Sequence, residues 1–234
     1  MIIALNNKSN LTKEKFEEYQ KQLSLIKSVS SKIILCPTST YLALYNLTNI
    51  ELGAQNVSKD EQGAHTGEIA ASQLECLNVK YCIVGHSERR QELNESSDDT
   101  NKKIKNLFTK NIIPILCVGE TKEEKELGKT TSLIKEQLQI AIKDLSVEEK
   151  NNIIIAYEPI WSIGTGLIPT IEDIEEVLSL IKEILPNAKC LYGGSANDEN
   201  INYLKTSNLI DGYLLGGLSL KPEKLQIFIE KAEN

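Results

Sequence analysis

The stretch IIIAYEPIWSIGTGLIPTIEDIEEVLSLI, residues 153–181, contains one full copy of the pattern that organises the chain. Residues 153–157 form a short apolar run rich in β-branched side chains, which is typical of a strand buried on both faces. From Ile171 onward, apolar residues recur at the spacing of an amphipathic helix. A buried strand followed by an amphipathic helix predicts one β–α unit of a parallel sheet.

Seven other apolar runs have the same character, at residues 2–5, 33–35, 51–54, 81–84, 112–118, 189–192 and 212–215. Most are followed by a charged stretch with helical periodicity, although Tyr41–Tyr45 offers little more than a turn or two. Eight units in 234 residues average about 29 residues each, which predicts an α/β fold closed as a (β/α)₈ barrel. A doubly wound open sheet is the alternative. No linker or composition break divides the chain, so one domain over residues 1–234 is expected.

The composition is that of a globular protein and argues against several partners. Twenty-six Lys and Arg against 33 Asp and Glu give a net charge of −7. Nucleic acids and anionic membranes need a basic face, so neither is expected as a partner. No apolar run approaches the roughly 20 residues of a membrane helix, and the first residues lack the pattern of a signal peptide. These features predict a cytoplasmic location, where the five scattered cysteines would stay reduced.

The chemistry of such a barrel lies where its strands end and its loops begin. Asn6 and Lys8 follow the first expected strand and share one side of an extended chain, which predicts an amide donor beside a cation. His86 follows the fourth, before an expected helix capped by Ser87. Because a helix start disfavours a charged imidazole, we expect a neutral ring able to donate a hydrogen bond. The alternatives are that Lys8 is a solvated loop residue and that His86 has a structural role, with its ring bonded to the backbone.

Glu158 follows the sixth expected strand. Pro159 restricts its backbone and ends the strand, so the carboxylate is fixed at the barrel mouth, as a general base requires. The next segment, Ile160–Gly166, carries two glycines and Trp161, the only tryptophan of the chain. Exposed loops seldom carry such apolar side chains, so this segment is expected to fold over a ligand. A loop that merely packs on the core is the alternative.

Two diglycines follow the last two expected strands. They are Gly193-Gly194, before Ser195, and Gly216-Gly217. Glycines let backbone N–H groups approach an anion closely, and barrels often bind phosphate at this place. The pattern therefore favours a phosphate site at the seventh and eighth strand ends.

Seven motifs, spread in order over nearly the whole chain, resemble those of the triosephosphate isomerase family, whose fold is the TIM barrel. They are Asn6-x-Lys8, Gly63–Glu68, Gly85–Arg90, Cys117–Glu120, Tyr157–Gly166, Tyr192–Ser195 and Leu215–Gly217. The resemblance implies an isomerase that interconverts dihydroxyacetone phosphate and D-glyceraldehyde 3-phosphate through an enediolate, in glycolysis and gluconeogenesis. It implies no metal and no organic cofactor. Other sugar-phosphate barrel enzymes and a noncatalytic phosphate sensor are the alternatives.

The resemblance also implies catalytic roles. Glu158 corresponds to the base that moves a proton between C1 and C2. His86 corresponds to the neutral electrophile, assisted by Lys8 as a fixed cation and Asn6 as a donor. The residues implied to hold the substrate phosphate through backbone N–H groups are Gly164, Ser195, Gly216 and Gly217.

Supporting and lid roles follow from the same resemblance. The side chains concerned are Glu88, Glu120, Tyr157, Trp161 and Tyr192. The Trp161 indole would donate to Tyr157 when the lid is open and to Glu120 when it is closed. The loop Gln55–Glu68 resembles the segment that docks into a neighbouring subunit, which implies a homodimer with Thr66 near the partner's active site.

Three features depart from the family pattern. Asn7 stands where the family usually has an aromatic residue, and Leu5 where it has glycine. The segment 167–169 replaces a short polar hinge. Because Pro169 has no N–H, it cannot make the closing bond that the family forms to the tyrosine matching Tyr192. The chain is also short around Tyr41–Ile50.

Overall fold

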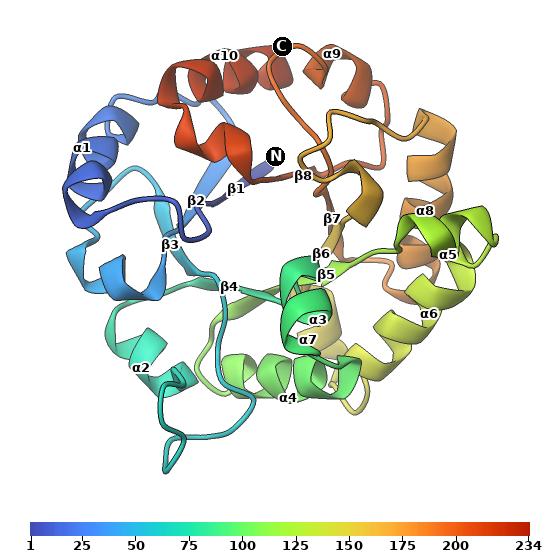
Figure 1. The fold of residues 1–234 in the computed structure, drawn as a ribbon, viewed down its shortest axis with the longest axis horizontal. Helices are drawn as coiled ribbons and strands as arrows, with labels where there is room; N and C mark the ends of the chain where they lie inside the picture. Colours follow the sequence, from blue (N-terminus) through green and yellow to red (C-terminus); the bar gives the residue numbers. More distant parts are fainter.

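The computed structural model describes residues 1–234 as a closed barrel of eight parallel strands inside a ring of helices (Figure 1). The strands are β1 (Ile2–Asn6), β2 (Lys32–Cys36), β3 (Glu51–Ala54), β4 (Tyr81–Val84), β5 (Ile113–Val118), β6 (Ile154–Tyr157), β7 (Lys189–Tyr192) and β8 (Gly212–Leu215). Each strand pairs with the next along the chain, and β8 pairs with β1. The predicted (β/α)₈ barrel is confirmed, and the open sheet is wrong.

The connections between the strands are mostly helical. The α-helices are α1 (Lys13–Leu23), α2 (Ala71–Cys76), α3 (Ser87–Leu93), α4 (Ser97–Phe108), α5 (Lys122–Glu126), α6 (Thr130–Ala141), α7 (Val147–Asn152), α8 (Ile171–Ile184), α9 (Ile201–Leu204) and α10 (Pro222–Glu233). Three short 3₁₀ helices add to them: η1 (Ser39–Leu44), η2 (Ile160–Ser162) and η3 (Gly217–Leu220). Only η1 lies between β2 and β3, where the sequence offers little more than a turn or two.

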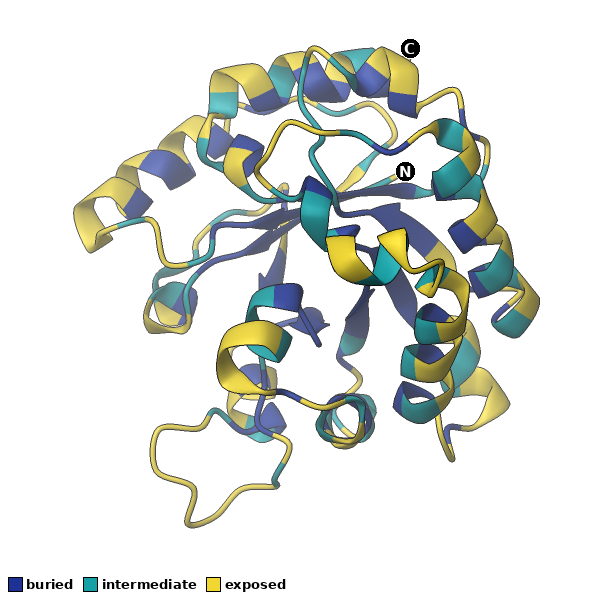
Figure 2. Cartoon of the chain, turned by 45° about the vertical axis from the view of Figure 1, so that its right-hand side comes forward, coloured by how far each residue is buried: buried dark blue, intermediate teal, exposed yellow.

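The strands bury both of their faces, as their apolar sequences require. In β1, Ala4 points into the barrel, whereas Ile3 and Leu5 pack in the layer beneath the helices. The helices present buried residues inward and exposed residues outward (Figure 2). The barrel therefore has a filled interior and a continuous outer core, and its working groups lie at the ends of the strands.

The first helix is shorter than its periodicity predicts. Ile26 fits the apolar spacing, but α1 ends at Leu23. The N–H groups of Leu25 and Ile26 turn back to carbonyls three residues earlier. Ile26 is still buried, so its apolar character reflects packing and not helix formation.

Residues 61–68, between β3 and α2, are all exposed and form a loop that projects from the body of the barrel (Figure 2). None of the helices combines the length and the hydropathy that crossing a bilayer requires. All five cysteines are free thiols.

Candidate active site

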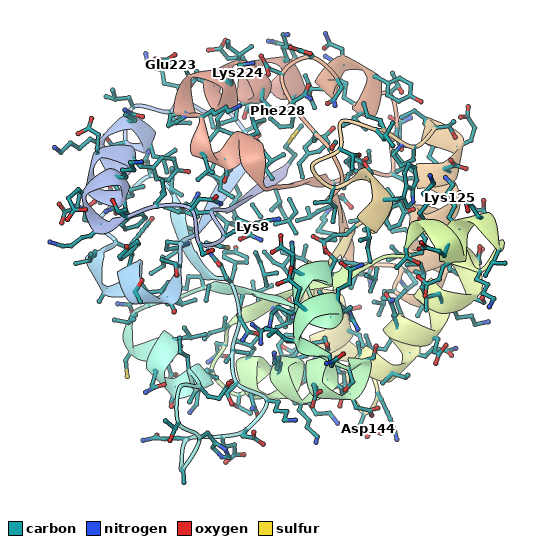
Figure 3. The ribbon with its side chains drawn as sticks, in the orientation of Figure 1. Lys8, Lys125, Asp144, Glu223, Lys224 and Phe228 are labelled. Atoms are coloured by element: carbon teal, nitrogen blue, oxygen red, sulfur yellow. The ribbon has the colours of Figure 1, made fainter.

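A cavity of about 410 Å³ at the carboxyl ends of the strands gathers the residues expected to act on substrate. Eight of its lining residues were predicted as catalytic or phosphate-binding: Asn6, Lys8, His86, Glu158, Gly164, Ser195, Gly216 and Gly217. They come from distant parts of the chain and meet because the barrel brings the carboxyl ends of all its strands to one face. Figure 3 shows Lys8 reaching the centre of this mouth.

The Glu158 carboxylate is buried and held on both oxygens. Its Oε1 lies 3.1 Å from Nε2 of His86, and its Oε2 accepts the backbone N–H of Ser87 at 3.2 Å. Burial raises the pKa of Glu158, but the His86 ring and these hydrogen bonds outweigh it, and the net pKa is lowered. The carboxylate is therefore ionised at neutral pH, as a base must be.

Two glycines make room for Glu158, one beside its backbone and one beside its side chain. A Cβ on Gly119, just after β5, would lie 1.8 Å from the carbonyl oxygen of Glu158. A Cβ on Gly193, just after β7, would lie 2.8 Å from Cγ of Glu158. The sequence pointed to Gly193 only as a phosphate contact and assigned no role to Gly119. The one signal for Gly119 was its place in the motif Cys117–Glu120.

The structure corrects the predicted start of α3. His86, and not Ser87, is the capping residue, because His86 Nδ1 accepts the N–H of Glu88 at 3.3 Å. This leaves the N–H of Ser87 to hold Glu158. Since Nδ1 acts as an acceptor, the imidazole proton lies on Nε2 and points at Glu158.

The pKa of His86 shifts in the direction opposite to that expected from the helix start. Burial lowers this pKa, but the Glu158 carboxylate raises it more strongly, and the net pKa is raised. The prediction considered only the N–H groups at the helix start, because the sequence does not show that the Glu158 carboxylate lies beside the His86 ring. The hydrogen-bond pattern itself is that of a neutral imidazole.

Asn6 and Lys8 converge on the cavity, but not as neighbours on an extended chain. β1 ends at Asn6, and Lys8 has a left-handed backbone with φ 52°. The N–H of Lys8 donates to Asn6 Oδ1 at 3.0 Å, which leaves the Asn6 NH₂ group to donate elsewhere. The Lys8 ammonium pairs with the carboxylate of Glu88.

Asn7 occupies the position where the family usually has an aromatic residue. It is 1% exposed, and its Nδ2 lies 3.2 Å from both the Tyr19 hydroxyl and the Ser219 hydroxyl. These contacts tie the end of β1 to α1 and η3. Because Ser219 is more than 200 residues away in the chain, no local pattern could reveal this network.

The segment after Glu158 lies over the end of β7 and is here called the lid, residues 159–168. Its indole donor, Trp161 Nε1, bonds Glu120 Oε1 at 2.9 Å, and the Tyr157 hydroxyl bonds the same oxygen at 3.2 Å. Glu120 is the acceptor that the family resemblance assigns to a closed lid. The ammonium of Lys125, on α5 (Figure 3), lies 4.3 Å from the centre of the Trp161 ring and holds it by a cation–π contact.

The lid also contacts the expected phosphate end of the cavity. The N–H of Gly166 donates to Ser195 Oγ at 3.2 Å. Gly164 and Gly166 have φ angles of 69° and 79°, which favour glycine. The N–H of Ser195, expected to face a phosphate, donates here to Ser162 Oγ at 3.2 Å. No role for Ser162 was predicted from the sequence.

Comparison with known proteins adds independent findings. The family model described as triosephosphate isomerase matches residues 1–232. The triosephosphate isomerase of Dictyoglomus turgidum (strain DSM 6724 / Z-1310) is 44% identical over 237 residues, covering 95% of this chain and 95% of that protein. The triosephosphate isomerase of Clostridium botulinum (strain Langeland / NCTC 10281 / Type F) is 40% identical over 244 residues, covering 97% and 98%. That of Clostridium tetani (strain Massachusetts / E88) is 39% identical, covering 94% and 92%.

Proposed function

The chain belongs to the triosephosphate isomerase family, and we propose that the cavity holding Glu158 and His86 is where it acts. It is an isomerase of glycolysis that interconverts dihydroxyacetone phosphate and D-glyceraldehyde 3-phosphate. The observation that carries the assignment of the site is the meeting of a buried carboxylate, an Nε2 donor, a cation and an amide in one cavity lined by the late glycines.

Glu158 is the base in this proposal. Its carboxylate takes a proton from C1 of dihydroxyacetone phosphate, and the electron pair moves through the C1–C2 bond to the carbonyl oxygen on C2. The proton of O1 then moves to O2 by way of His86 Nε2. The carboxylate returns its proton to C2, which gives the aldehyde. The charge that develops on the oxygens faces preorganised donors, namely the ring of His86, the ammonium of Lys8 and the amide of Asn6.

The phosphate lies at the other end of the cavity. Backbone N–H groups of Gly164, Ser195, Gly216 and Gly217 hold it. The lid covers the enediolate and excludes water, which limits the loss of phosphate from this intermediate. In this role the N–H of Ser195 exchanges its bond to Ser162 for a bond to the phosphate.

The test of the proposal is a coupled assay with the purified chain. D-glyceraldehyde 3-phosphate is supplied, and the dihydroxyacetone phosphate formed is reduced by glycerol-3-phosphate dehydrogenase with NADH. We expect rapid NADH consumption by the protein and none above background by Glu158→Gln. Equal rates for the two proteins would remove this cavity as the site of the reaction.

A homodimer is the assembly that these surfaces favour. The exposed loop tip, residues 61–68, projects from one side of the barrel. A groove of about 490 Å³, lined among others by Lys8, Gln55 and Glu88, lies directly beside the active site. The loop Gln55–Glu68 of one subunit would enter this groove of the other, which places Thr66 next to the partner's active site. Such reciprocal docking generates a two-fold interface.

The proposal also covers the location, the ligands and the domain organisation of the enzyme. We place the enzyme in the cytoplasm, with triose phosphates as its ligands and without nucleic-acid or membrane partners, in keeping with its net charge of −7. Residues 1–234 are a single domain, because the first and last strands pair with each other to close the ring.

A further inference from the structure

Ser162 lies at the end of η2 in the lid, and its side chain is fully buried. Its hydroxyl is within hydrogen-bond distance of three groups from different segments. The carbonyl oxygen of Leu167 lies at 2.6 Å, the Tyr192 hydroxyl at 3.2 Å and the backbone nitrogen of Ser195 at 3.2 Å. Leu167 belongs to the far end of the lid, whereas Tyr192 and Ser195 belong to β7 and the loop after it.

Donor and acceptor chemistry fixes the direction of each bond. The carbonyl of Leu167 can only accept, so the single hydrogen of Ser162 Oγ points there. The N–H of Ser195 can only donate, so Ser162 Oγ accepts it. The third bond then runs from the Tyr192 hydroxyl to Ser162 Oγ. All three bonding positions of this hydroxyl are filled, and the Tyr192 hydroxyl, which is also buried, is satisfied.

We propose that Ser162 is a positioning residue that latches the closed lid, and that its hydroxyl supplies the lid-to-Tyr192 bond that Pro169 cannot make. The latch joins both ends of the lid to β7 through one atom. The proposal rests on the function of the lid given above, since it concerns how the lid stays over substrate.

The latch has two consequences for the reaction. Gly164, expected to contact the phosphate, lies between the two lid residues that the latch connects. Loosening it therefore weakens the hold on the phosphate end of a ligand. It also exposes the enediolate, whose C–O bond to phosphate can break to release inorganic phosphate and an enol that becomes methylglyoxal.

The test is a double-mutant cycle read out as affinity for 2-phosphoglycolate, a phosphate-bearing carboxylate that resembles the enediolate, measured by calorimetry. One buried hydrogen bond corresponds to about a 2- to 10-fold change. We expect Ser162→Ala and Tyr192→Phe each to weaken binding by this factor, and the double variant to bind no more weakly than the weaker single variant. If the two effects multiply, or if Ser162→Ala binds as the parent does, the latch is wrong.

Thr165→Ala is the matched control. The Thr165 hydroxyl contacts only lid groups, namely the carbonyls of Trp161 and Ser162 and the N–H of Leu167. Its loss removes a hydroxyl from the same lid without touching β7, so its effect should multiply with that of Tyr192→Phe. Thermal unfolding of each variant separates the latch from a purely structural bond. If the effects of Ser162→Ala and Tyr192→Phe depend on each other in thermal stability but not in affinity for 2-phosphoglycolate, the proposal is wrong.

Two further measurements complete the design. Pro169→Ala restores an N–H at the hinge, so it should recover affinity in the Ser162→Ala background and change it less than about 2-fold in the parent. Ser162→Ala should also release more inorganic phosphate per turnover than the parent. If Pro169→Ala fails to recover affinity in the Ser162→Ala background, or if Ser162→Ala releases no more inorganic phosphate than the parent, the latch is contradicted. Because the cycle measures binding, it stands apart from the isomerase assay, whose failure would instead refute the proposed function.

Discussion

At Glu158, the carboxylate is fixed by a contact on each oxygen, to His86 and to Ser87. Glu158→Asp keeps the charge but withdraws it by one methylene, and a misplacement of about 1 Å can cost on the order of 100-fold in rate. We expect kcat to fall by about that factor, with a much smaller change in the affinity for 2-phosphoglycolate. Steady-state kinetics and inhibition measure the two effects. Near-normal turnover of the Asp variant would exclude Glu158 as the base.

The protonation of His86 is also decided by its immediate neighbour. Because the Glu158 carboxylate raises the pKa of His86, NMR titration of the protein should place this pKa above the ordinary histidine value of about 6.5. In Glu158→Gln the burial and the Glu88 carboxylate remain while the stronger negative charge is gone, so the pKa of His86 should fall below that of the parent. His65→Gln assigns the second histidine signal. A pKa that is unchanged in Glu158→Gln would show that the carboxylate does not control this ring.

Single residues were predictable from the sequence where their position alone implies a function. Glu158 directly follows an apolar run and His86 follows one after a single glycine, so their place at the barrel mouth could be predicted before any contact was known. Ser162, Gly119 and Asn7 were missed because their roles depend on partners from other strands. No local spacing contains that information.

At the scale of elements, the end of α10 anchors the loop before β2. The Glu233 carboxylate accepts the N–H groups of residues 29–31 and the hydroxyl of Ser28. Burial raises the pKa of Glu233, but these hydrogen bonds together outweigh it and hold the pKa well below its usual range. A carboxyl whose folded pKa is lowered stabilises the fold above its unfolded pKa of about 4.5 and loses that contribution as the pH falls.

Glu233→Gln should therefore lower the free energy of unfolding by about 1–2 kcal/mol at pH 7. The deficit relative to the parent should shrink as the pH is lowered below about 4.5, because the carboxyl of the unfolded parent then takes up a proton while that of the folded parent stays ionised. Urea unfolding at several pH values measures both. Glu230→Gln is the control, since this exposed carboxylate on the same helix contacts only the side chain of Gln226. A deficit that is constant with pH would contradict the ionic origin of the anchor.

Strands were more predictable than helix ends. Four of the eight predicted strands have the observed bounds, three differ by one residue at one end, and β2 is one residue longer at each end than predicted. The agreement is close because an apolar run bounded by polar residues defines a buried strand. Helix starts depend on which acceptor reaches the free N–H groups, and at α3 the imidazole of His86 does so although serine is the usual capping residue. The left-handed turn at Lys8 had no glycine to mark it.

For the whole molecule, the proposed dimer predicts that stability and assembly depend on concentration. Light scattering should give about twice the chain mass of 26.1 kDa, and the unfolding temperature should rise with protein concentration. Thr66→Arg changes an exposed loop tip, so it should shift the protein toward monomer and lower its turnover while the barrel stays folded. Ser132→Arg, on the exposed side of α6, should change neither. An active monomer of the parent would rule out the dimer as the working form.

The closure of the ring also has a consequence for how the chain is made. The second partner of β1 is β8, so residues 2–5 emerge from the ribosome first and meet residues 212–215 only when synthesis is nearly complete. At about 5–20 residues per second, one edge of the nascent sheet stays open for roughly 10–40 s. An open β edge is a template for pairing with other chains. The shape that protects the finished enzyme from such pairing thus leaves the growing polypeptide exposed to it for almost the whole of translation.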